Sequence, residues 1–141
     1  RRTKNTLKIL VMGLPGSGKT TLAQQLQKKL KCVWFNEDEI RHHVSRDLTD
    51  LAKDQLEQAT RLGRLCDIVL RTNRYTIADG VCPTAEARQA FKPTFIIWMA
   101  TVKDSDYQGF ESPDYVHLNI DSWNYDINDI VKIIRQYAEH T

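Results

Sequence analysis

The sequence predicts a three-layer α/β domain in which helices cover both faces of a five-stranded parallel sheet. Five short, almost continuously apolar segments predict the strands, because parallel strands covered on both faces read this way. They are residues 8–12, 32–35, 75–79, 95–100 and 115–120. Longer segments of helical period alternate with them, as right-handed strand–helix–strand connections require. A chain of 141 residues has the length of one domain with one core, so residues 1–141 are predicted to form a single domain.

The helical segments are identified by their apolar periodicity. One helix lies between the first two strands, where Leu22, Leu26 and Leu30 recur every four residues. A longer helix is expected over residues 51–70, with these residues among those facing inward: Ala52, Leu56, Ala59, Leu62 and Cys66. A short helix is expected within residues 83–93, which begin and end with proline. The last helix presents one apolar face made of Ile127, Ile130, Val131, Ile134, Tyr137 and Ala138.

Composition excludes several classes of protein. The residues are 41% hydrophobic and 27% charged, which is typical of a folded globular chain and not of a disordered one. No apolar run approaches the roughly 20 residues that span a bilayer, and no signal-peptide pattern opens the chain. A net charge of +2 does not favour nucleic-acid binding. The opening residues RRTKNTLK are basic and lack an initiator methionine, so we expect a solvated tail at a processed or trimmed end.

The cysteines indicate a reducing environment. Cys32, Cys66 and Cys82 are odd in number and widely spaced, and they form neither a zinc pattern nor a CxxC pair. Cys32 and Cys66 stand in apolar segments and are expected to be buried thiols. Free thiols of this kind favour a cytoplasmic location.

The segment after the first strand reads GLPGSGKTT and fits the phosphate-binding pattern G-x-x-x-x-G-K-[ST]. The glycines let backbone N–H groups point inward at the start of the following helix. Lys19 would reach the β- and γ-phosphates of ATP, and the Thr20 hydroxyl would ligate Mg²⁺. The residues expected to bind the nucleotide are Gly13, Leu14, Pro15, Gly16, Ser17, Gly18, Lys19, Thr20 and Thr21. Such loops serve kinases, ATPases, GTPases and simple nucleotide binders, so the loop alone does not identify the reaction.

The segment after the second strand, FNEDEIRHHVSRDL (residues 35–48), should lie beside the phosphate loop, because ligands bind at the carboxyl ends of parallel strands. Taken together, GLPGSGKTT and NEDEIRHHVSRDL resemble the adenylylsulfate kinase family, which carries D-G-D-N-[VI]-R-H-G-L-N-x-D-L in the second place. IADGVCPTAEAR resembles the family's I-A-S-F-I-S-P-Y segment. The resemblance covers about residues 7–100.

The resemblance implies a P-loop nucleotide kinase fold and a defined reaction. Members of the family transfer the γ-phosphoryl group of ATP to the 3′-hydroxyl of adenylylsulfate, in sulfate assimilation. The implied partners are therefore ATP with Mg²⁺ and a small anionic acceptor, adenylylsulfate or a related compound. No membrane partner is expected, and a homodimer is left open.

The family pattern suggests roles for two residues of the second segment. Asp38 matches the second aspartate of the family and would orient or deprotonate the accepting hydroxyl and contact hydrated Mg²⁺. Arg41 lies three residues on, on the same side of a short helix, and could bind an anionic oxygen. With Lys19, these two form the predicted catalytic set. Ile40 and Val44, one turn apart, are expected to hold the helix to the core.

An ordinary solvated helix start is the alternative reading of this segment. His42 and His43 are expected at the surface, because no other ligand stands at a suitable spacing for a metal.

The sequence departs from the family at the acceptor side. Asn36 and Glu37 replace the family's first aspartate and its glycine. Gln55 and Gln58 stand where the family has the arginine and asparagine that hold adenylylsulfate, and they are the predicted acceptor-binding positions here. Glutamine can donate hydrogen bonds but cannot neutralise a sulfate.

Two further departures follow the third strand. Asp79 replaces a serine, and an acid at this strand end suits outer-sphere coordination of Mg²⁺, which would compensate for the changed residues at the second strand. Cys82 also replaces a serine. With Pro83 it is predicted to border the acceptor, either as a reactive thiol near a helix N-terminus or as a small packing residue.

The lid that family members close over the phosphates is predicted to be absent or shortened. Residues 101–114 contain one cation, Lys103, among several acids. Cations could instead come from elsewhere in the chain: Arg71, Arg74, Arg88 and Lys92. Three residues of the segment could cover the adenine or simply pack locally: Tyr107, Phe110 and Pro113.

Three functions are therefore open at the level of sequence. The first is adenylylsulfate kinase activity. The second is a P-loop kinase for another acceptor, such as a nucleotide, a sugar or a nucleic-acid end, as the two glutamines suggest. The third is a nucleotide-binding module with weak or no kinase activity, as the reduced lid suggests.

Overall fold

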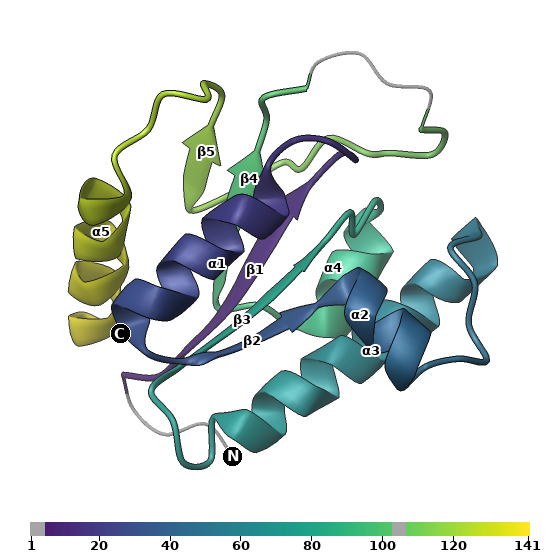
Figure 1. Cartoon of the computed structure of the whole chain (residues 1–141), viewed down its shortest axis with the longest axis horizontal. Helices are drawn as coiled ribbons and strands as arrows, with labels where there is room; N and C mark the ends of the chain where they lie inside the picture. The colour runs from purple at the N-terminus through teal and green to yellow at the C-terminus, as the bar shows by residue number, and fades with distance from the viewer. Residues whose placement is uncertain (1–4, 103–106) are drawn as a thin grey trace.

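The computed structural model describes residues 5–102 and 107–141 and is built on a five-stranded parallel sheet with strand order β2-β3-β1-β4-β5 (Figure 1). The strands are β1 (Leu7–Gly13), β2 (Val33–Asn36), β3 (Tyr75–Gly80), β4 (Phe95–Met99) and β5 (Leu118–Ile120). All five predicted strands are confirmed. The last is shorter than predicted, because the Nδ1 atom of His117 accepts the backbone N–H of Ile96 at 3.0 Å and so takes the place of a ladder carbonyl.

Helices cover both faces of the sheet, as predicted (Figure 1). They are α1 (Lys19–Leu30), α2 (Glu37–His43), α3 (Ala52–Val69), α4 (Ala85–Phe91) and α5 (Ile127–Glu139). Alternate residues of β1 face opposite layers: Leu7, Ile9 and Val11 pack with α1 and α5, and Leu10 and Met12 pack with α3 and α4. No helix within the described ranges is long and apolar enough to cross a membrane.

The predicted faces of α1 and α5 are confirmed. Leu22, Leu26 and Leu30 of α1 are buried, and most of the predicted face of α5 is buried against the same core. Cys32 and Cys66 are free and buried, and burial raises the pKa of both thiols to about 12.

The predicted inward face of α3 is wrong in its first half. Ala52 and Leu56 are exposed, whereas Gln55 and Gln58 are buried with Ala59, Leu62 and Cys66. The two glutamines tolerate burial because their Nε2 atoms donate to backbone carbonyls, at 3.0 Å to Asp50 and 3.2 Å to Glu37. These hydrogen bonds to neighbouring segments therefore set which face of α3 is buried. The apolar periodicity of the sequence does not reveal such bonds.

Val44 does not hold α2 to the core. The helix ends at His43, and the side chain of Val44 is 64% exposed. Ile40 is partly buried against the core, as expected, and Ser45 is the next buried residue. The N–H groups of Val44 and Ser45 both bond the carbonyl of Ile40, so the chain turns before Val44 could continue the apolar stripe.

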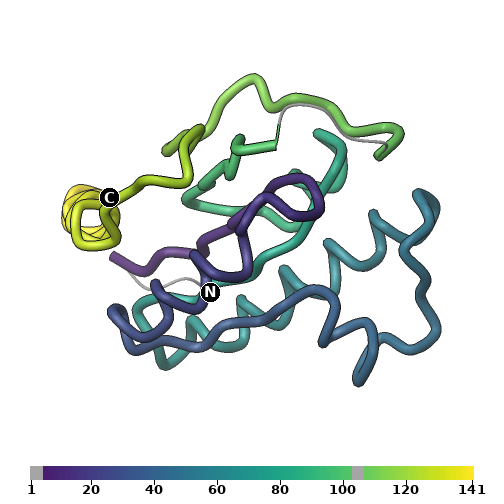
Figure 2. The backbone as a smooth tube through the Cα atoms, turned by 45° about the horizontal axis from the view of Figure 1, so that its top comes forward, coloured from purple at the N-terminus to yellow at the C-terminus, as the bar shows by residue number. Residues whose placement is uncertain are grey.

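The strand register brings the predicted chemical groups to one edge of the sheet. Asn36 at the end of β2 pairs with Asp79 of β3, and Gly13 at the end of β1 pairs with Met99 of β4. The segment after β1 therefore emerges between β3 and β4. In both ribbon views it lies beside the segment that follows β4 (Figures 1 and 2), where the Thr101 hydroxyl donates to the carbonyl of Ser17 at 2.7 Å.

The corrected face of α3 can be tested by two leucine truncations. Leu62 is 4% exposed and Leu56 is 39% exposed. We expect Leu62→Ala to lower the free energy of unfolding by roughly 2–4 kcal/mol, because it leaves a cavity in the core. Leu56→Ala should cost less than about 1 kcal/mol. Urea unfolding followed by circular dichroism measures both; equal losses would contradict the observed rotation of α3.

Candidate phosphoryl-transfer site

The loop between β1 and α1 forms an open cradle. Gly16 and Gly18 adopt φ angles of 80° and 89°, in the left-handed region that glycine enters without strain. α1 begins at Lys19 and no side chain caps its N-terminus, so its first N–H groups are available to an anion. Lys19 Nζ lies 3.5 Å from the carbonyl of Leu14, which keeps the ammonium group over the loop.

Asp79 lies under this loop and organises it. Its carboxylate is 1% exposed and accepts hydrogen bonds from Trp34 Nε1 at 2.6 Å, Asn36 Nδ2 at 3.0 Å and the Thr20 hydroxyl at 3.3 Å. Burial raises the pKa of Asp79, and the bonds from Trp34 and Asn36 oppose that rise. A buried carboxylate whose donors only partly compensate its desolvation is a favourable neighbour for a cation.

Compared with the pattern of the adenylylsulfate kinase family, the acid of this site stands at the end of β3 and not at the end of β2. That pattern has an aspartate at the position of Asn36 and a serine at the position of Asp79. Here the two residues are direct partners across β2 and β3, and Asn36 donates to both Asp79 and the Thr20 hydroxyl. One carboxylate thus remains beside Thr20, but it enters from the adjacent strand.

The residues around Thr20 fit a magnesium ion that is held mainly by phosphate oxygens and water. The described part of the chain contains no group of three or more His, Cys, Asp or Glu that could hold a metal by itself. Mg²⁺ in nucleotide sites typically takes one or two protein oxygens and fills its remaining positions with phosphate and water. Thr20 and Asp79 are two of the predicted ligands that could hold it in this way.

Glu37 is a second buried acid, at a position where the family pattern has a glycine. It is 7% exposed, and Arg41 Nη2 donates to its Oε1 at 2.5 Å. Its carboxylate lies against the backbone of Gly80: a Cβ added at Gly80 would overlap Oε2 and lie 3.0 Å from Cδ. Burial raises the pKa of Glu37, and Arg41 opposes the rise.

A cavity of about 330 Å³ lies between the phosphate loop and the neighbouring acids Glu37 and Asp38. It contains phosphate-loop residues, acids from three segments and one tyrosine. Its lining consists of Pro15, Gly16, Lys19, Thr20, Glu37, Asp38, Arg41, Asp50, Gln55, Asp79, Gly80, Val81 and Tyr107. The predicted catalytic residues Lys19, Asp38 and Arg41 therefore border one space.

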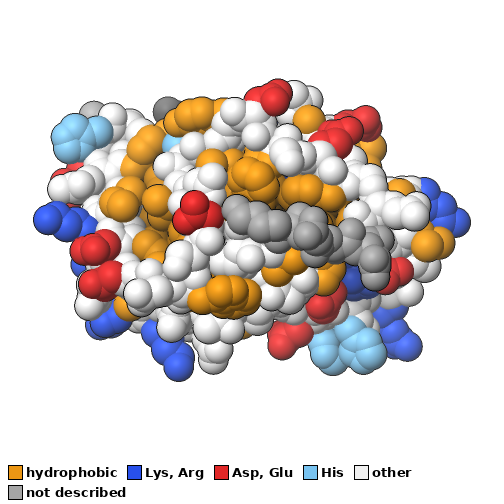
Figure 3. All heavy atoms as spheres, turned by 90° about the horizontal axis from the view of Figure 1, so that it is seen from above, with side chains coloured by type: hydrophobic (Ala, Val, Ile, Leu, Met, Phe, Trp, Pro, Cys, Tyr) orange, Lys and Arg blue, Asp and Glu red, His pale blue; other side chains and the backbone are white. Residues whose placement is uncertain are grey.

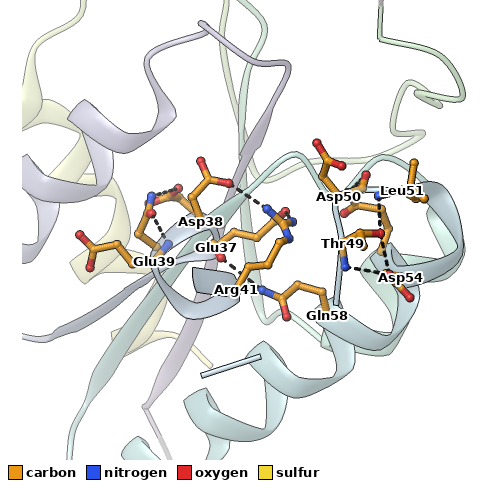
Figure 4. Close-up of polar contacts among 12 residues, drawn as sticks. Glu37, Asp38, Glu39, Arg41, Thr49, Asp50, Leu51, Asp54 and Gln58 are labelled. Carbon is orange, nitrogen blue, oxygen red and sulfur yellow. Dashed lines mark hydrogen bonds and ion pairs between the residues drawn. The ribbon is translucent and has the colours of Figure 1, made fainter. Parts of the chain in front are cut away.

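Asp38 and Arg41 lie as an ion pair at the mouth of the cavity (Figure 4). The side chain of Asp38 is 87% exposed, and Arg41 Nη1 donates to it at 3.0 Å. Arg41 thus binds two acids at once, Asp38 and Glu37, while its Nε is buried without a partner in the described structure. The positive charge of Arg41 is largely neutralised within the protein.

The predicted acceptor-binding residues separate into two groups. Gln55 lines the cavity, where its amide is already bonded to the carbonyl of Asp50. Gln58 lies behind it, 1% exposed, and contacts the backbone of Glu37 (Figure 4). Cys82 and Pro83 are buried and are not among the residues lining the cavity. Burial raises the pKa of Cys82 to about 12, which suits the packing alternative and not the reactive thiol.

The cations proposed as substitutes for a lid do not reach the cavity. Arg71 and Arg74 lie at the amino end of β3, in a separate hollow near Asn5. Lys92 borders another hollow, beside α3. Arg88 is buried and donates to the carbonyls of Cys82, Pro83 and Glu111, so it fixes the loop around them. That expectation was wrong, because a cation must stand at the carboxyl ends of the strands to meet the phosphates.

The segment after β4 contributes Tyr107 to the cavity, whereas Phe110 packs on the body of the protein. Phe110 lies 6.5 Å from Trp98 and 5.4 Å from the Arg88 guanidinium, both measured to its ring centre. No helix or strand occurs in residues 100–102 or 107–117.

Two of the predicted features, Lys103 and the basic start of the chain at 1–4, lie outside the described residues. His42 and His43 are exposed, as predicted.

Two candidate residues were missed at the level of sequence. Glu37 was read only as a lost glycine, although its position directly after an apolar strand could have identified it as an acid at the site. Trp123 is 61% exposed and lies against the phosphate loop, where a Cβ on Gly18 would be 2.6 Å from its ring. No local pattern connects Trp123 to that loop, because about a hundred residues separate them.

Comparison with known proteins identifies a family and sequence relatives. Residues 9–96, more than half of the chain, match the family model described as AAA domain. An adenylyl-sulfate kinase from Shewanella pealeana is 28% identical over 100 residues, which cover 67% of this chain and 49% of that protein. Chloroplastic adenylyl-sulfate kinase 1 of Arabidopsis thaliana is 37% identical over 87 residues, which cover 58% of this chain and 32% of that protein. The chain thus matches about half or less of each relative's length.

A solved structure supports the fold. The APS kinase of Mycobacterium tuberculosis in complex with AMPPNP and APS superposes with a TM-score of 0.75, over 96% of this chain and 98% of that one. The identity is 16%, so this likeness bears on the fold alone.

The contact between Glu37 and Gly80 gives a test of the buried acid. Gly80 does not adopt a left-handed φ, so the backbone accepts alanine, and the nearest opposing atoms are the Glu37 carboxylate and, at 3.2 Å, the Glu37 Cβ. We expect Gly80→Ala to lower the free energy of unfolding by roughly 1–3 kcal/mol through overpacking. In a Glu37→Ala background the same change should cost at least about 1 kcal/mol less. A urea-unfolding cycle over the four proteins measures the coupling, and additive effects would place the Glu37 carboxylate elsewhere.

Proposed function

Since this chain belongs to the AAA domain family and its sequence relatives are adenylyl-sulfate kinases, we propose that it is an ATP-dependent phosphotransferase of the adenylyl-sulfate kinase type. One observation carries the proposal. The phosphate loop, with its Thr20–Asp79 contact, opens into the same cavity as the acids Glu37 and Asp38. A module that only bound nucleotide would not need carboxylates on the side opposite the phosphates.

We propose the following parts of an in-line transfer. The loop N–H groups and Lys19 would hold the β- and γ-phosphates. Thr20 and Asp79 would help to hold a Mg²⁺ ion, which would supply positive charge against the phosphates. The acceptor hydroxyl oxygen would form a bond to the γ-phosphorus while the bond from that phosphorus to the bridging oxygen breaks. ADP then leaves with the electron pair, and a cavity carboxylate takes the proton of the hydroxyl.

Two carboxylates compete for the role of proton acceptor. Asp38 is the sequence-based candidate, and it stands at the mouth of the cavity in contact with solvent. Glu37 is nearly buried, and its raised pKa brings it closer to the working range of a general base at neutral pH. We propose that Asp38, together with Arg41, orients the acceptor. Asp38 is also the first candidate for the general base, and Glu37 is the second.

Adenylylsulfate is the first acceptor to consider, because the sequence relatives are adenylyl-sulfate kinases. A different small acceptor is the second candidate function. Gln55 on the cavity wall carries no charge. The positive charge of Arg41 is neutralised by the two acids bonded to it, Glu37 and Asp38. The cavity itself therefore offers little positive charge to a sulfate.

The proposed activity is tested by acceptor-dependent ADP release in a coupled assay with Mg-ATP. We expect release that depends on an added acceptor, with adenylylsulfate, adenosine, nucleoside monophosphates and simple sugars as the panel. Lys19→Ala, which removes the phosphate-binding ammonium, is the inactive control. Tight Mg-ATP binding without acceptor-dependent release across the panel would instead favour a nucleotide-binding module.

The two carboxylates are separated by matched amide substitutions. If Glu37 accepts the proton, Glu37→Gln should lower kcat by about 100-fold or more and leave the KM for ATP near that of the parent protein. Asp38→Asn should then act mainly on the acceptor KM. If Asp38 is the base, the larger loss of kcat moves to Asp38→Asn. Glu39→Gln, on the same helix and outside the cavity lining, is the control for loss of one charge, and it should have little effect. Equal small effects of all three would remove both acids from catalysis.

A further inference from the structure

An open groove of about 700 Å³ adjoins the phosphoryl-transfer cavity on the outer side of α2. It is lined by Asp38, Arg41, His42, His43, Arg46 and Leu48, and we call it the α2 groove. Asp38 and Arg41 line both spaces, so the groove and the cavity meet at that ion pair. The Asp38–Arg41 pair therefore forms part of the wall of both spaces.

The α2 groove holds the positive charge that the cavity lacks. In the cavity, Lys19 serves the nucleotide and Arg41 is bonded to two acids. In the groove, Arg46 is exposed and makes no hydrogen bond or ion pair with any residue in the described ranges. The nearby acid Asp47 does not neutralise it, because both Asp47 oxygens are bonded to Arg61, at 2.7 and 2.8 Å.

The two histidines add donors to the same surface. His42 and His43 are exposed, their rings lie edge to face with centroids 4.9 Å apart, and no described residue hydrogen-bonds to either ring. In the space-filling view, histidine and Lys or Arg side chains lie together at the lower right edge of the face (Figure 3). Imidazole N–H groups and a guanidinium fork are the donors that bind phosphate and sulfate oxygens.

The charges of the groove are not those of the resembled family. In the pattern D-G-D-N-[VI]-R-H-G-L-N-x-D-L, His43 stands at a glycine and Arg46 at the variable position. Gln55, in turn, stands where that pattern's next helix has an arginine. Relative to that pattern, the chain has no cation at position 55 of α3 and carries additional donors at the end of α2 and just after it, His43 and Arg46.

We propose that the α2 groove binds the anionic group of the phosphoryl acceptor, with Arg46 as its principal cation and His43 as a second donor. The reacting hydroxyl lies in the cavity beside Glu37 and Asp38, and the phosphate or sulfate of the acceptor lies outside it. The acceptor is then a small hydroxyl compound that carries a phosphate or sulfate ester at a distance from the reacting oxygen. This inference rests on the proposed phosphotransferase function and specifies where that function obtains its acceptor selectivity.

The test compares three acceptors that share one nucleoside: adenylylsulfate, adenosine 5′-monophosphate and adenosine. Each is titrated by calorimetry into protein saturated with Mg-AMPPNP, which occupies the nucleotide site. We expect Arg46→Gln to weaken binding of the two charged compounds by about three- to tenfold, the range for an exposed charge-assisted contact. Adenosine and Mg-AMPPNP should bind as to the parent protein, within about twofold. Arg46→Lys, which keeps the charge, should recover most of the loss.

The control for charge is Arg64→Gln, because Arg64 is an exposed arginine of α3 that borders a different hollow. Three outcomes overturn the proposal: an equal loss for adenosine, an equal loss in the Arg64 variant, or no binding of any of the three compounds. A selective loss for the charged compounds, together with acceptor-dependent ADP release by the parent protein, supports it. Selective binding without any turnover would reject the phosphotransferase function and retain the groove as an anion site.

Discussion

The site depends on one constraint, which is that a carboxylate must remain buried beneath the phosphate loop. Asp79 meets it at the end of β3, where hydrogen bonds from Trp34, Asn36 and Thr20 partly compensate its loss of hydration. The pairing of β2 with β3 sets Asn36 against Asp79, so the two strand ends share one acid between them. Because Thr20 is bonded to the same carboxylate, the sheet also fixes the start of α1 and, with it, the phosphate cradle.

The second feature of the site is the distribution of charge around α2. Glu37 occupies space that exists only because Gly80 has no side chain, and it binds Arg41 from within the protein. Asp38 binds the same guanidinium from the solvent side. The charge of the arginine that would otherwise meet an anionic acceptor is therefore neutralised by the two acids. Further along the same surface, the side chains of His42, His43 and Arg46 have no hydrogen-bond partner among the described residues. The hydroxyl of an acceptor would accordingly lie in the cavity, and its anionic group would contact the α2 groove.

Particular residues show which structural features could be predicted from the sequence and which could not. The phosphate loop, the strands and the faces of α1 and α5 were predictable, because each depends on a local pattern of glycines or apolar residues. The first half of α3 was not, since Gln55 and Gln58 are buried through bonds to the carbonyls of Asp50 and Glu37, which come from other segments. Val44 was misplaced for a similar reason: the turn after Ile40 ends α2 before the apolar stripe can continue. Arg71 and Arg74 could not be assigned to an end of the sheet by composition.

By itself, the sequence determined a parallel α/β chain with a phosphate loop and an acid–base segment after its second strand, because local periodicity and spacing specify those features. Tertiary structure decided which acids are buried, which cations are already paired, and which groove shares lining residues with the cavity. Those properties depend on burial and on contacts between residues that lie far apart in the chain. Asn36 with Asp79, Glu37 with Gly80, and Trp123 with Gly18 meet only when the sheet and its connections are complete.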